Sequence, residues 1–171
     1  GAIRTGNTAP RDWTKSLRSV DLFDIKADGL FVLESLGAPT NNIQVDALGA
    51  PNWYHPGRSG AFRLGPNILG YFGDIHPKVL REMDVDGPIV GFEVFIEKIP
   101  AARSKGPSRP LLKLDTLQSV NRDFSFVVDQ TISAERLIRA AQGAEKVLIS
   151  DVHLFDEYVG QGIPEGKKSL A

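Results

Sequence analysis

The sequence contains no cysteine, which excludes disulfides, zinc–thiolate sites and thiol nucleophiles. It also has no apolar run near the roughly 20 residues that span a bilayer, and no basic segment leads into an apolar stretch as in a signal peptide. Neither sign of charge dominates, because 20 basic and 21 acidic residues give a net charge of −1. Any nucleic-acid contact must therefore use a local patch. We expect a cytoplasmic protein without a membrane partner.

Methionine is scarce as well, since Met83 is the only one and the chain opens on Gly1. The sequence stops at Ala171, where a strand that starts near Lys168 has barely begun. We therefore expect an internal piece of a longer protein. The 171 residues, 42% of them hydrophobic and 24% charged, have the composition of an ordinary globular protein with one domain or two small ones.

Residues 1–99 are predicted to form an antiparallel sheet with two helices, after an irregular basic entry at residues 1–19. The first helix is expected to end at Gly37, and the second to begin at His76-Pro77, because proline suits the first helical position. A tight turn at Gly65 predicts a hairpin. The expected strands lie at 20–24, 42–48, 61–64, 68–75 and 89–99.

The last third of the chain, residues 118–171, is predicted to contain a strand, a helix and a second strand, with a third strand beginning at Lys168. Alternating apolar residues favour a strand at 123–129. Ser133 is a suitable N-cap for the helix that follows, and Gly143 can end that helix. The second strand is expected between 147 and 160.

Residues 100–117 are predicted to be a linker, because they are rich in proline and serine. The stretch from 98 to 113 is basic and contains no acid; its positive residues are Lys98, Arg103, Lys105, Arg109 and Lys113. Two interpretations stay open: a solvated connector, or a segment that lies along phosphates.

A metal site or a hydrolase nucleophile is disfavoured by the spacing of the reactive residues. The candidate ligands are His55, His76, His153, Asp24, Asp74 and Asp156, and no histidine pair has the H-x₃-H spacing of a zinc helix. Ser59 lacks the strand-to-helix elbow of a G-x-S-x-G nucleophile. Residues 55–59 are better explained as a turn, in which Gly57 allows a positive φ and Arg58 is free to pair with a carboxylate.

Asp156 and Tyr158 are one residue apart, so their side chains would emerge on the same side of a continuing strand. An ionised carboxylate can accept hydrogen bonds from N1–H and N2–H of an unpaired guanine, and an aromatic ring can stack on the base. The pair therefore predicts a site for one base of a single-stranded RNA loop. The alternative is structural, with Tyr158 half-buried in the sheet and Asp156 accepting a turn hydrogen bond.

Several motifs resemble the β-subunit family of phenylalanyl-tRNA synthetases. In the last third these are Arg122-Asp123-Phe124, Phe155-Asp156-x-Tyr158 with glycine after it, and Pro164-x-Gly166-Lys167-Lys168-Ser169-Leu170-Ala171, which resemble the ferredoxin-fold anticodon-binding domain. Earlier ones are Leu22-Phe23-Asp24-Ile25-Lys26, 54–59, 73–77 and 91–93, which resemble the synthetase-like core. The resemblance implies an α+β protein: a noncatalytic class II synthetase-like core with antiparallel sheet at 1–99, the linker at 100–117, and an incomplete ferredoxin-like domain at 118–171.

The resemblance also implies function. Asp156 and Tyr158 match the residues that hold the first anticodon base of phenylalanine tRNA, Ser169 matches a hydroxyl contact, and Ser125 stands where the family usually has alanine. Candidate phosphate contacts are Arg122, Lys167 and Lys168, for which a solubility role is equally open. The implied partners are phenylalanine tRNA and the catalytic α subunit of an α2β2 complex. ATP and Mg²⁺ belong to that complex; no catalytic residue, metal or cofactor is expected here, and the fragment alone should be inactive.

Two expectations limit this interpretation. A ferredoxin-like domain has the order β-α-β-β-α-β, and residues 118–171 supply only its first half. We expect this half to be completed by other residues or to be marginally stable with an exposed edge. The competing function is a protein-interaction module that never touches RNA.

Overall fold

The computed structural model describes residues 1–14, 16–101, 111–112 and 117–171. It divides into two compact units, Gly1–Ser108 and Arg109–Ala171. Each unit combines helix with an antiparallel sheet, which confirms the predicted α+β class. Most of the predicted linker, at 102–110 and 113–116, falls outside the described residues, and so does the prediction that its charges lie along phosphates.

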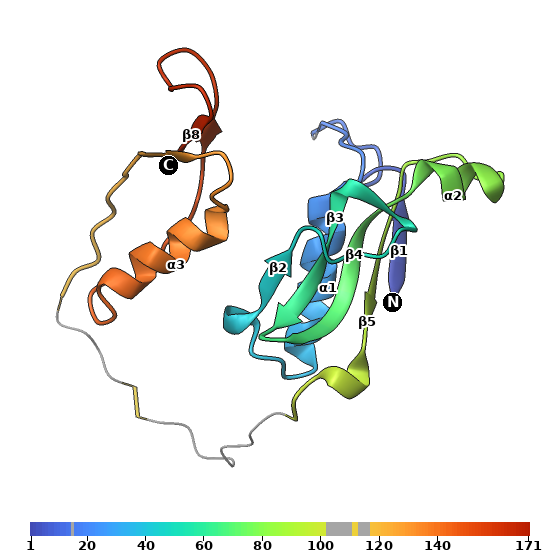
Figure 1. Cartoon of the computed structure of the whole chain (residues 1–171). Helices are drawn as coiled ribbons and strands as arrows, with labels where there is room; N and C mark the ends of the chain where they lie inside the picture. Colours follow the sequence, from blue (N-terminus) through green and yellow to red (C-terminus); the bar gives the residue numbers. More distant parts are fainter. Residues whose placement is uncertain (15, 102–110, 113–116) are drawn as a thin grey trace. The chain divides into compact units, whose positions relative to one another are not determined.

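The first unit is built on a five-stranded sheet with the order β1-β5-β4-β3-β2, in which all neighbours are antiparallel (Figure 1). Its strands are β1 (Ala2–Thr5), β2 (Gln44–Asp46), β3 (Tyr54–Leu64), β4 (Asn67–Ile75) and β5 (Ile89–Val94). The predicted hairpin is present as β3 and β4, with Gly65 at φ +59° in its turn. Two of the predictions for this sheet differ from the structure at its ends: β1 lies in the expected irregular entry, and β5 ends at Val94, before the short 3₁₀ helix η2 (Ile96–Lys98).

Helix α1 (Leu22–Ser35) occupies the position of the strand predicted at 20–24. The Asp21 carboxylate accepts hydrogen bonds from the backbone N–H of Phe23 and Asp24, at 2.8 and 3.2 Å. The Asp24 carboxylate accepts one in return from the Asp21 N–H at 2.9 Å, which completes a capping box. These local bonds satisfy the first amide groups of a helix, so they outweigh the short apolar run that suggested a strand. The helix ends before Gly37 at φ +84°, as predicted.

The core of the first unit lies between α1 and the sheet. Ile25, Gly29 and Leu33 are the buried residues of α1, and the helix contacts β4 and β5. The rings of Phe62 and Phe72 stack with centroids 4.5 Å apart. A Cβ atom at Gly29 would lie 2.7 Å from the Phe62 ring, so glycine lets the helix approach the sheet closely. The buried cluster consists of Val20, Ile25, Leu33, Ala38, Phe62, Leu69, Phe72, Val90 and Phe92.

Residues 55–59 form a bulge inside β3, whereas a turn was predicted. In the register with β4, residues 55–58 lie opposite Asp74 alone. The Gly57 N–H donates to Nδ1 of His55 at 3.1 Å, and the Ser59 hydroxyl donates to the His55 carbonyl at 2.7 Å. Gly57 does not use the positive φ that a glycine allows there. The chain thus makes turn-like local bonds and then rejoins the same ladder, because β4 continues alongside.

Helix α2 (Pro77–Glu82) begins as predicted, with His76 as its N-cap. Nδ1 of His76 accepts a hydrogen bond from the Lys78 N–H at 3.0 Å. The other short element of this unit is the 3₁₀ helix η1 (Thr40–Asn42), which comes before β2.

The capping box of α1 predicts a contribution to acid stability. A hydrogen-bonded ion pair with Arg18, 2.7 Å long, lowers the pKa of Asp24 from 3.8 to about 2. Because the folded pKa is the lower one, this stabilisation is present above about pH 4 and is lost as the pH falls toward about 2. We expect Asp24→Asn, which keeps an acceptor for the Asp21 N–H, to reduce the loss of unfolding free energy over that interval. Urea unfolding at each pH measures the free energy of unfolding. The control is Glu82→Gln, at an exposed carboxylate, which should lose as much unfolding free energy over the interval as wild type. If Glu82→Gln reduces the loss as much as Asp24→Asn does, the effect is not specific to Asp24.

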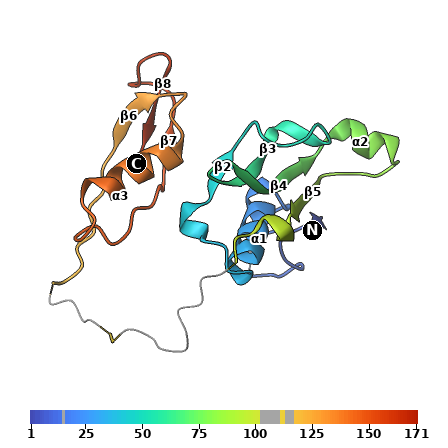
Figure 2. The same ribbon diagram turned by 60° about the horizontal axis from the view of Figure 1, so that its bottom comes forward.

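The second unit consists of β6 (Phe126–Asp129), α3 (Ala134–Ala144), β7 (Glu157–Tyr158) and β8 (Lys167–Leu170). Its sheet has the order β6-β8-β7, so the last strand lies between the first two (Figure 2). This is a split β-α-β arrangement, the connection expected for the first half of a ferredoxin-like fold. Ser133 is the N-cap of α3 as predicted, and its Oγ accepts from the Arg136 N–H at 3.3 Å. Gly143 does not end the helix, which continues to Ala144.

The strand predicted between 147 and 160 is reduced to Glu157–Tyr158. Only Glu157 and Tyr158 of this stretch pair with β8 in the strand register, and a strand exists only where a neighbour supplies backbone partners. In this unit Leu170 is the only described residue that is fully buried. The large apolar residues that stay exposed include Phe124, Val147, Leu148, Phe155 and Val159. No helix among the described residues is long and apolar enough to cross a membrane.

Candidate nucleic-acid interface

One face of the β6-β8-β7 sheet gathers the predicted recognition residues. Tyr158 on β7 lies directly opposite Ser169 on β8, and Val127 on β6 lies opposite Ser169 from the other side. Residues directly opposite each other in antiparallel strands point to the same face. Tyr158, Ser169 and Val127 therefore share a face, and the alternate positions Leu170, Phe126 and Glu157 share the other.

Ser125 joins this face through a hydrogen bond. Its Oγ lies 2.8 Å from the Oγ of Ser169, although the two residues are 44 positions apart in the chain. Ser125 precedes β6 and is two residues from Val127, which is consistent with their common face. Two residues that were predicted separately as base contacts are thus in direct contact with each other in the structure.

Asp156 extends the ladder by one residue beyond β7. Its backbone N–H donates to the Ala171 carbonyl at 3.2 Å, and the Ala171 N–H donates to the Asp156 carbonyl at 3.0 Å. Asp156 therefore lies opposite Ala171 and, by the two-residue period, on the face of Tyr158. Within the described part of the chain, the Asp156 carboxylate makes no hydrogen bond or ion pair, so the predicted turn contact is absent and the carboxylate is free to accept donors from a ligand.

The Tyr158 side chain is fixed by its hydroxyl group, while part of its ring surface stays exposed to solvent. Its hydroxyl donates to the Gln161 carbonyl at 3.3 Å. A Cβ atom at Gly160 would lie 2.7 Å from that hydroxyl oxygen, so the ring end rests against the bare backbone of the turn. The side chain is nevertheless 46% exposed, which leaves ring surface for stacking. Tyr158 therefore combines a structural contact through its hydroxyl with exposed ring surface.

The three candidate phosphate contacts do not lie together. We call the face that carries Tyr158 and Ser169 the recognition face. By register Lys167 lies on this face, and it pairs with Asp129 at 2.9 Å. Lys168 points to the opposite face, pairs with Glu157 at 3.2 Å and has a side chain only 13% exposed. Arg122 donates to the Asn121 carbonyl at 3.3 Å and is exposed. By register, therefore, Lys167 lies on the recognition face and Lys168 does not, and Arg122 lies before β6, outside the strand register.

Val127 and Gly160 belong to this surface but were not among the predicted site residues. The signal for Val127 was present, because Phe124, Phe126 and Val128 alternate with Ser125 and Val127 along the strand. The sequence carried no such signal for Gly160, since the role of this glycine depends on where the Tyr158 ring lies.

The described residues are not arranged as the alternative metal site or hydrolase site would require. His55 and His76 lie in the first unit with ring centroids 6.3 Å apart, and each uses Nδ1 to accept a backbone N–H. His153 lies in the other unit, where it contacts Asp151. No group of three or more His, Asp or Glu side chains suitable for a metal occurs among the described residues. Ser59 lies within β3 and not on a strand-to-helix elbow.

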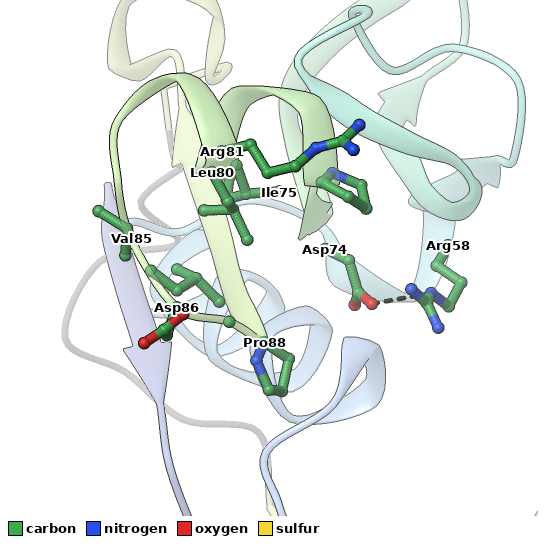
Figure 3. A pocket seen from close by; sticks show the side chains of 11 residues that line it. Arg58, Asp74, Ile75, Leu80, Arg81, Val85, Asp86 and Pro88 are labelled. Carbon is green, nitrogen blue, oxygen red and sulfur yellow. Dashed lines mark ion pairs between the residues drawn. The ribbon is translucent and has the colours of Figure 1, made fainter.

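A hollow of about 320 Å³ lies beside α2 in the first unit (Figure 3). Arg58 forms the predicted ion pair at its edge, with Asp74 at 2.8 Å. Burial raises the pKa of Asp74, and the Arg58 charge opposes this increase. The pair therefore ties the β3 bulge to β4. The remaining lining is largely apolar, including Leu80, Val85 and Pro88.

Comparison with known proteins identifies both units. The family model described as "Phenylalanyl tRNA synthetase beta chain CLM domain" matches residues 1–96, and the "Ferredoxin-fold anticodon binding domain" matches residues 116–171. The phenylalanine–tRNA ligase beta subunit of Cereibacter sphaeroides is 51% identical over 173 residues, which cover 99% of this chain and 21% of that protein. The corresponding subunit of Paramagnetospirillum magneticum is 49% identical over 170 residues, with 99% and 21% covered.

The same similarity extends to Bradyrhizobium diazoefficiens, whose phenylalanine–tRNA ligase beta subunit is 50% identical over 164 residues, or 94% of this chain and 20% of that protein. This chain spans about a fifth of the length of the curated relatives it matches. The order of the two matched domains, the split β-α-β sheet and the identity across nearly the whole chain agree with one another. The chain belongs to the phenylalanyl-tRNA synthetase beta chain family.

Proposed function

We propose that this chain contributes the anticodon-binding surface of a phenylalanine–tRNA ligase and holds the first anticodon base of phenylalanine tRNA. The observation that carries the proposal is the common face of Asp156, Tyr158 and Ser169, on which the Asp156 carboxylate has no partner among the described residues. An acceptor, a ring and a hydroxyl on one open sheet face are the groups needed to hold one unstacked base.

The chemistry of the three groups favours guanine. Its Watson–Crick edge carries two neighbouring donors, N1–H and N2–H, and a single carboxylate can accept both. The exposed surface of the Tyr158 ring can stack on the base, which contributes roughly 1–3 kcal/mol without selecting a sequence. The Asp156 contact adds the selectivity, because adenine offers an acceptor at N1 in place of a donor.

The rest of the proposal concerns the parent complex. The first unit would act as a noncatalytic scaffold that packs against an α subunit in an α2β2 assembly, in the cytoplasm. ATP and Mg²⁺ would serve the joining of phenylalanine to its tRNA in that subunit. In this proposal neither is assigned to this chain.

Binding of phenylalanine tRNA to the assembled αβ complex tests the proposal. Wild type is compared with Asp156→Ala, using tRNA with guanine or adenine as the first anticodon base. We expect the mutation to reduce the preference for guanine by about 5- to 150-fold, the equivalent of a bidentate contact worth roughly 1–3 kcal/mol. Glu157→Ala is the matched control, since it removes the same charge from the next residue, on the opposite face.

A second candidate function is a protein-interaction module without RNA contact. The exposed apolar side chains of the second unit, among them Phe124 and Phe155, favour it. This candidate predicts that Asp156→Ala and Glu157→Ala leave tRNA binding equally unchanged. That result would overturn the anticodon proposal and leave the family assignment intact.

A further inference from the structure

Within the proposed anticodon site, on which this inference depends, we propose that Ser125 is a positioning residue. Its hydroxyl donates to the Ser169 hydroxyl and so directs the Ser169 proton toward the bound base. The starting observation is the 2.8 Å contact between the two Oγ atoms, in which either oxygen could be the donor.

The strand order places Ser125 and a bound base on opposite sides of Ser169, so the direction of this hydrogen bond decides where the Ser169 proton points. β8 lies between β6 and β7, so Ser125 is on one side of Ser169, and Tyr158 and Asp156 are on the other. A base held by Asp156 and Tyr158 therefore lies on the β7 side of Ser169. If Ser169 donated to Ser125, its proton would point away from the base. If Ser125 donates, the Ser169 proton is free to turn toward the base.

The base itself requires a donor at this position. Once the Asp156 carboxylate accepts N1–H and N2–H of guanine, the group that remains on the same edge is the acceptor O6. Asp156 lies opposite Ala171, so it is the diagonal neighbour of Ser169, and residues in such a pair are roughly 7–8 Å apart, with their Cβ atoms somewhat closer. The Watson–Crick edge of a purine fits between two side chains at that spacing. A Ser169 proton aimed at O6 would complete the recognition of that edge.

Ser125 affects both the geometry and the strength of this contact. A lone serine hydroxyl rotates freely and can donate or accept, so by itself it does not distinguish an acceptor from a donor on the base. A hydroxyl that already accepts one hydrogen bond is a better donor, because linked hydrogen bonds polarise one another. When guanine presents its O6 acceptor, donation from Ser125 thus strengthens the hydrogen bond that Ser169 donates to it. Ser125 is an exposed residue that precedes β6, so replacing it should leave the sheet intact.

The test uses phenylalanine tRNA with single-atom changes in the first anticodon base, bound to the assembled αβ complex. In 6-thioguanine, sulfur replaces O6 as a weak acceptor while N1–H and the N2 amino group remain. In inosine, the N2 amino group is missing while O6 and N1–H remain. Dissociation constants are measured for wild type, Ser125→Ala, Ser125→Thr, Ser169→Ala, the double alanine variant and Asp156→Ala.

We expect Ser125→Ala to reduce the preference for guanine over 6-thioguanine by about 2- to 10-fold, the size of one neutral hydrogen bond. Its preference for guanine over inosine should be unchanged, and Asp156→Ala should show the reverse pattern. Ser125→Thr keeps the hydroxyl and should retain the wild-type preference. The double alanine variant should lose no more than Ser169→Ala alone, because Ser125 acts through Ser169.

Two results would overturn the inference in distinguishable ways. If Ser125→Ala keeps the full preference for guanine over 6-thioguanine while Asp156→Ala loses the preference over inosine, the positioning role is wrong and the anticodon site stands. If neither variant changes any preference, the anticodon site itself is wrong and the positioning role fails with it. Additive losses in the double variant would also contradict a positioning role, since they would show two independent contacts.

Discussion

Replacing Phe62 with alanine is expected to lower the free energy of unfolding of the first unit by about 3–5 kcal/mol. Phe62 is fully buried on β3, stacks on Phe72 with centroids 4.5 Å apart, and faces Gly29 of α1. Its removal would leave a cavity where the helix meets the sheet. Because domains of this size are stable by only about 5–15 kcal/mol, the loss is a large part of the total.

Urea unfolding of the full chain followed by tryptophan fluorescence measures this effect. The chain has only two tryptophans, Trp13 and Trp53, and both belong to the first unit, so the signal reports on that unit alone. Phe31→Ala is the matched control: Phe31 lies on α1 but is 70% exposed, and its replacement should change the stability by no more than about 0.5 kcal/mol. Equal losses in the two variants would show that the core is not centred on Phe62.

The second large effect concerns the proposed stacking ring. Tyr158→Ala should weaken binding of phenylalanine tRNA to the assembled complex by about 5- to 150-fold, the equivalent of roughly 1–3 kcal/mol of base stacking. The loss should be similar for guanine and adenine as the first anticodon base, because a ring stacks on either. Asp156→Ala is expected to act on the preference between bases, so the two variants separate affinity from selectivity.

Tyr158→Phe is the control that separates the ring from its hydroxyl. The hydroxyl makes one long hydrogen bond, to the Gln161 carbonyl at 3.3 Å, so its removal should change tRNA affinity by no more than about twofold. Circular dichroism of Tyr158→Ala should match wild type, since the side chain is 46% exposed and contributes little to packing. A Tyr158→Phe variant that binds as weakly as Tyr158→Ala would show that the hydroxyl, and not the ring, makes the contact.

Local sequence signals predicted those elements whose stabilising contacts are also local. The end of α1 near Gly37, the hairpin turn at Gly65, and the N-caps His76 and Ser133 all depend on backbone geometry or hydrogen bonds within a few residues. The motifs around Asp156 and Tyr158 likewise indicated the family, and the family models confirm it. The same reasoning failed at 20–24, where the capping box of Asp21 and Asp24 was also local but was overlooked.

Contacts between distant segments decided the elements that local sequence signals did not predict. Residues 55–59 contain every signal of a turn, yet they stay in β3 because β4 runs alongside and pairs on both sides of the bulge. The apolar run at 147–149 is not a strand, because β8 supplies register partners only to Glu157 and Tyr158 on that side.

In the candidate site, too, some features followed from the local sequence and others only from the tertiary structure. Asp156 and Tyr158 are two positions apart, so their common face followed from the period of a strand. The contact between Ser125 and Ser169, and the placement of Lys168 on the opposite face, depend on β8 lying between β6 and β7. Periodicity along a strand determines which residues alternate, but only the pairing of strands determines which residues from distant parts of the chain meet.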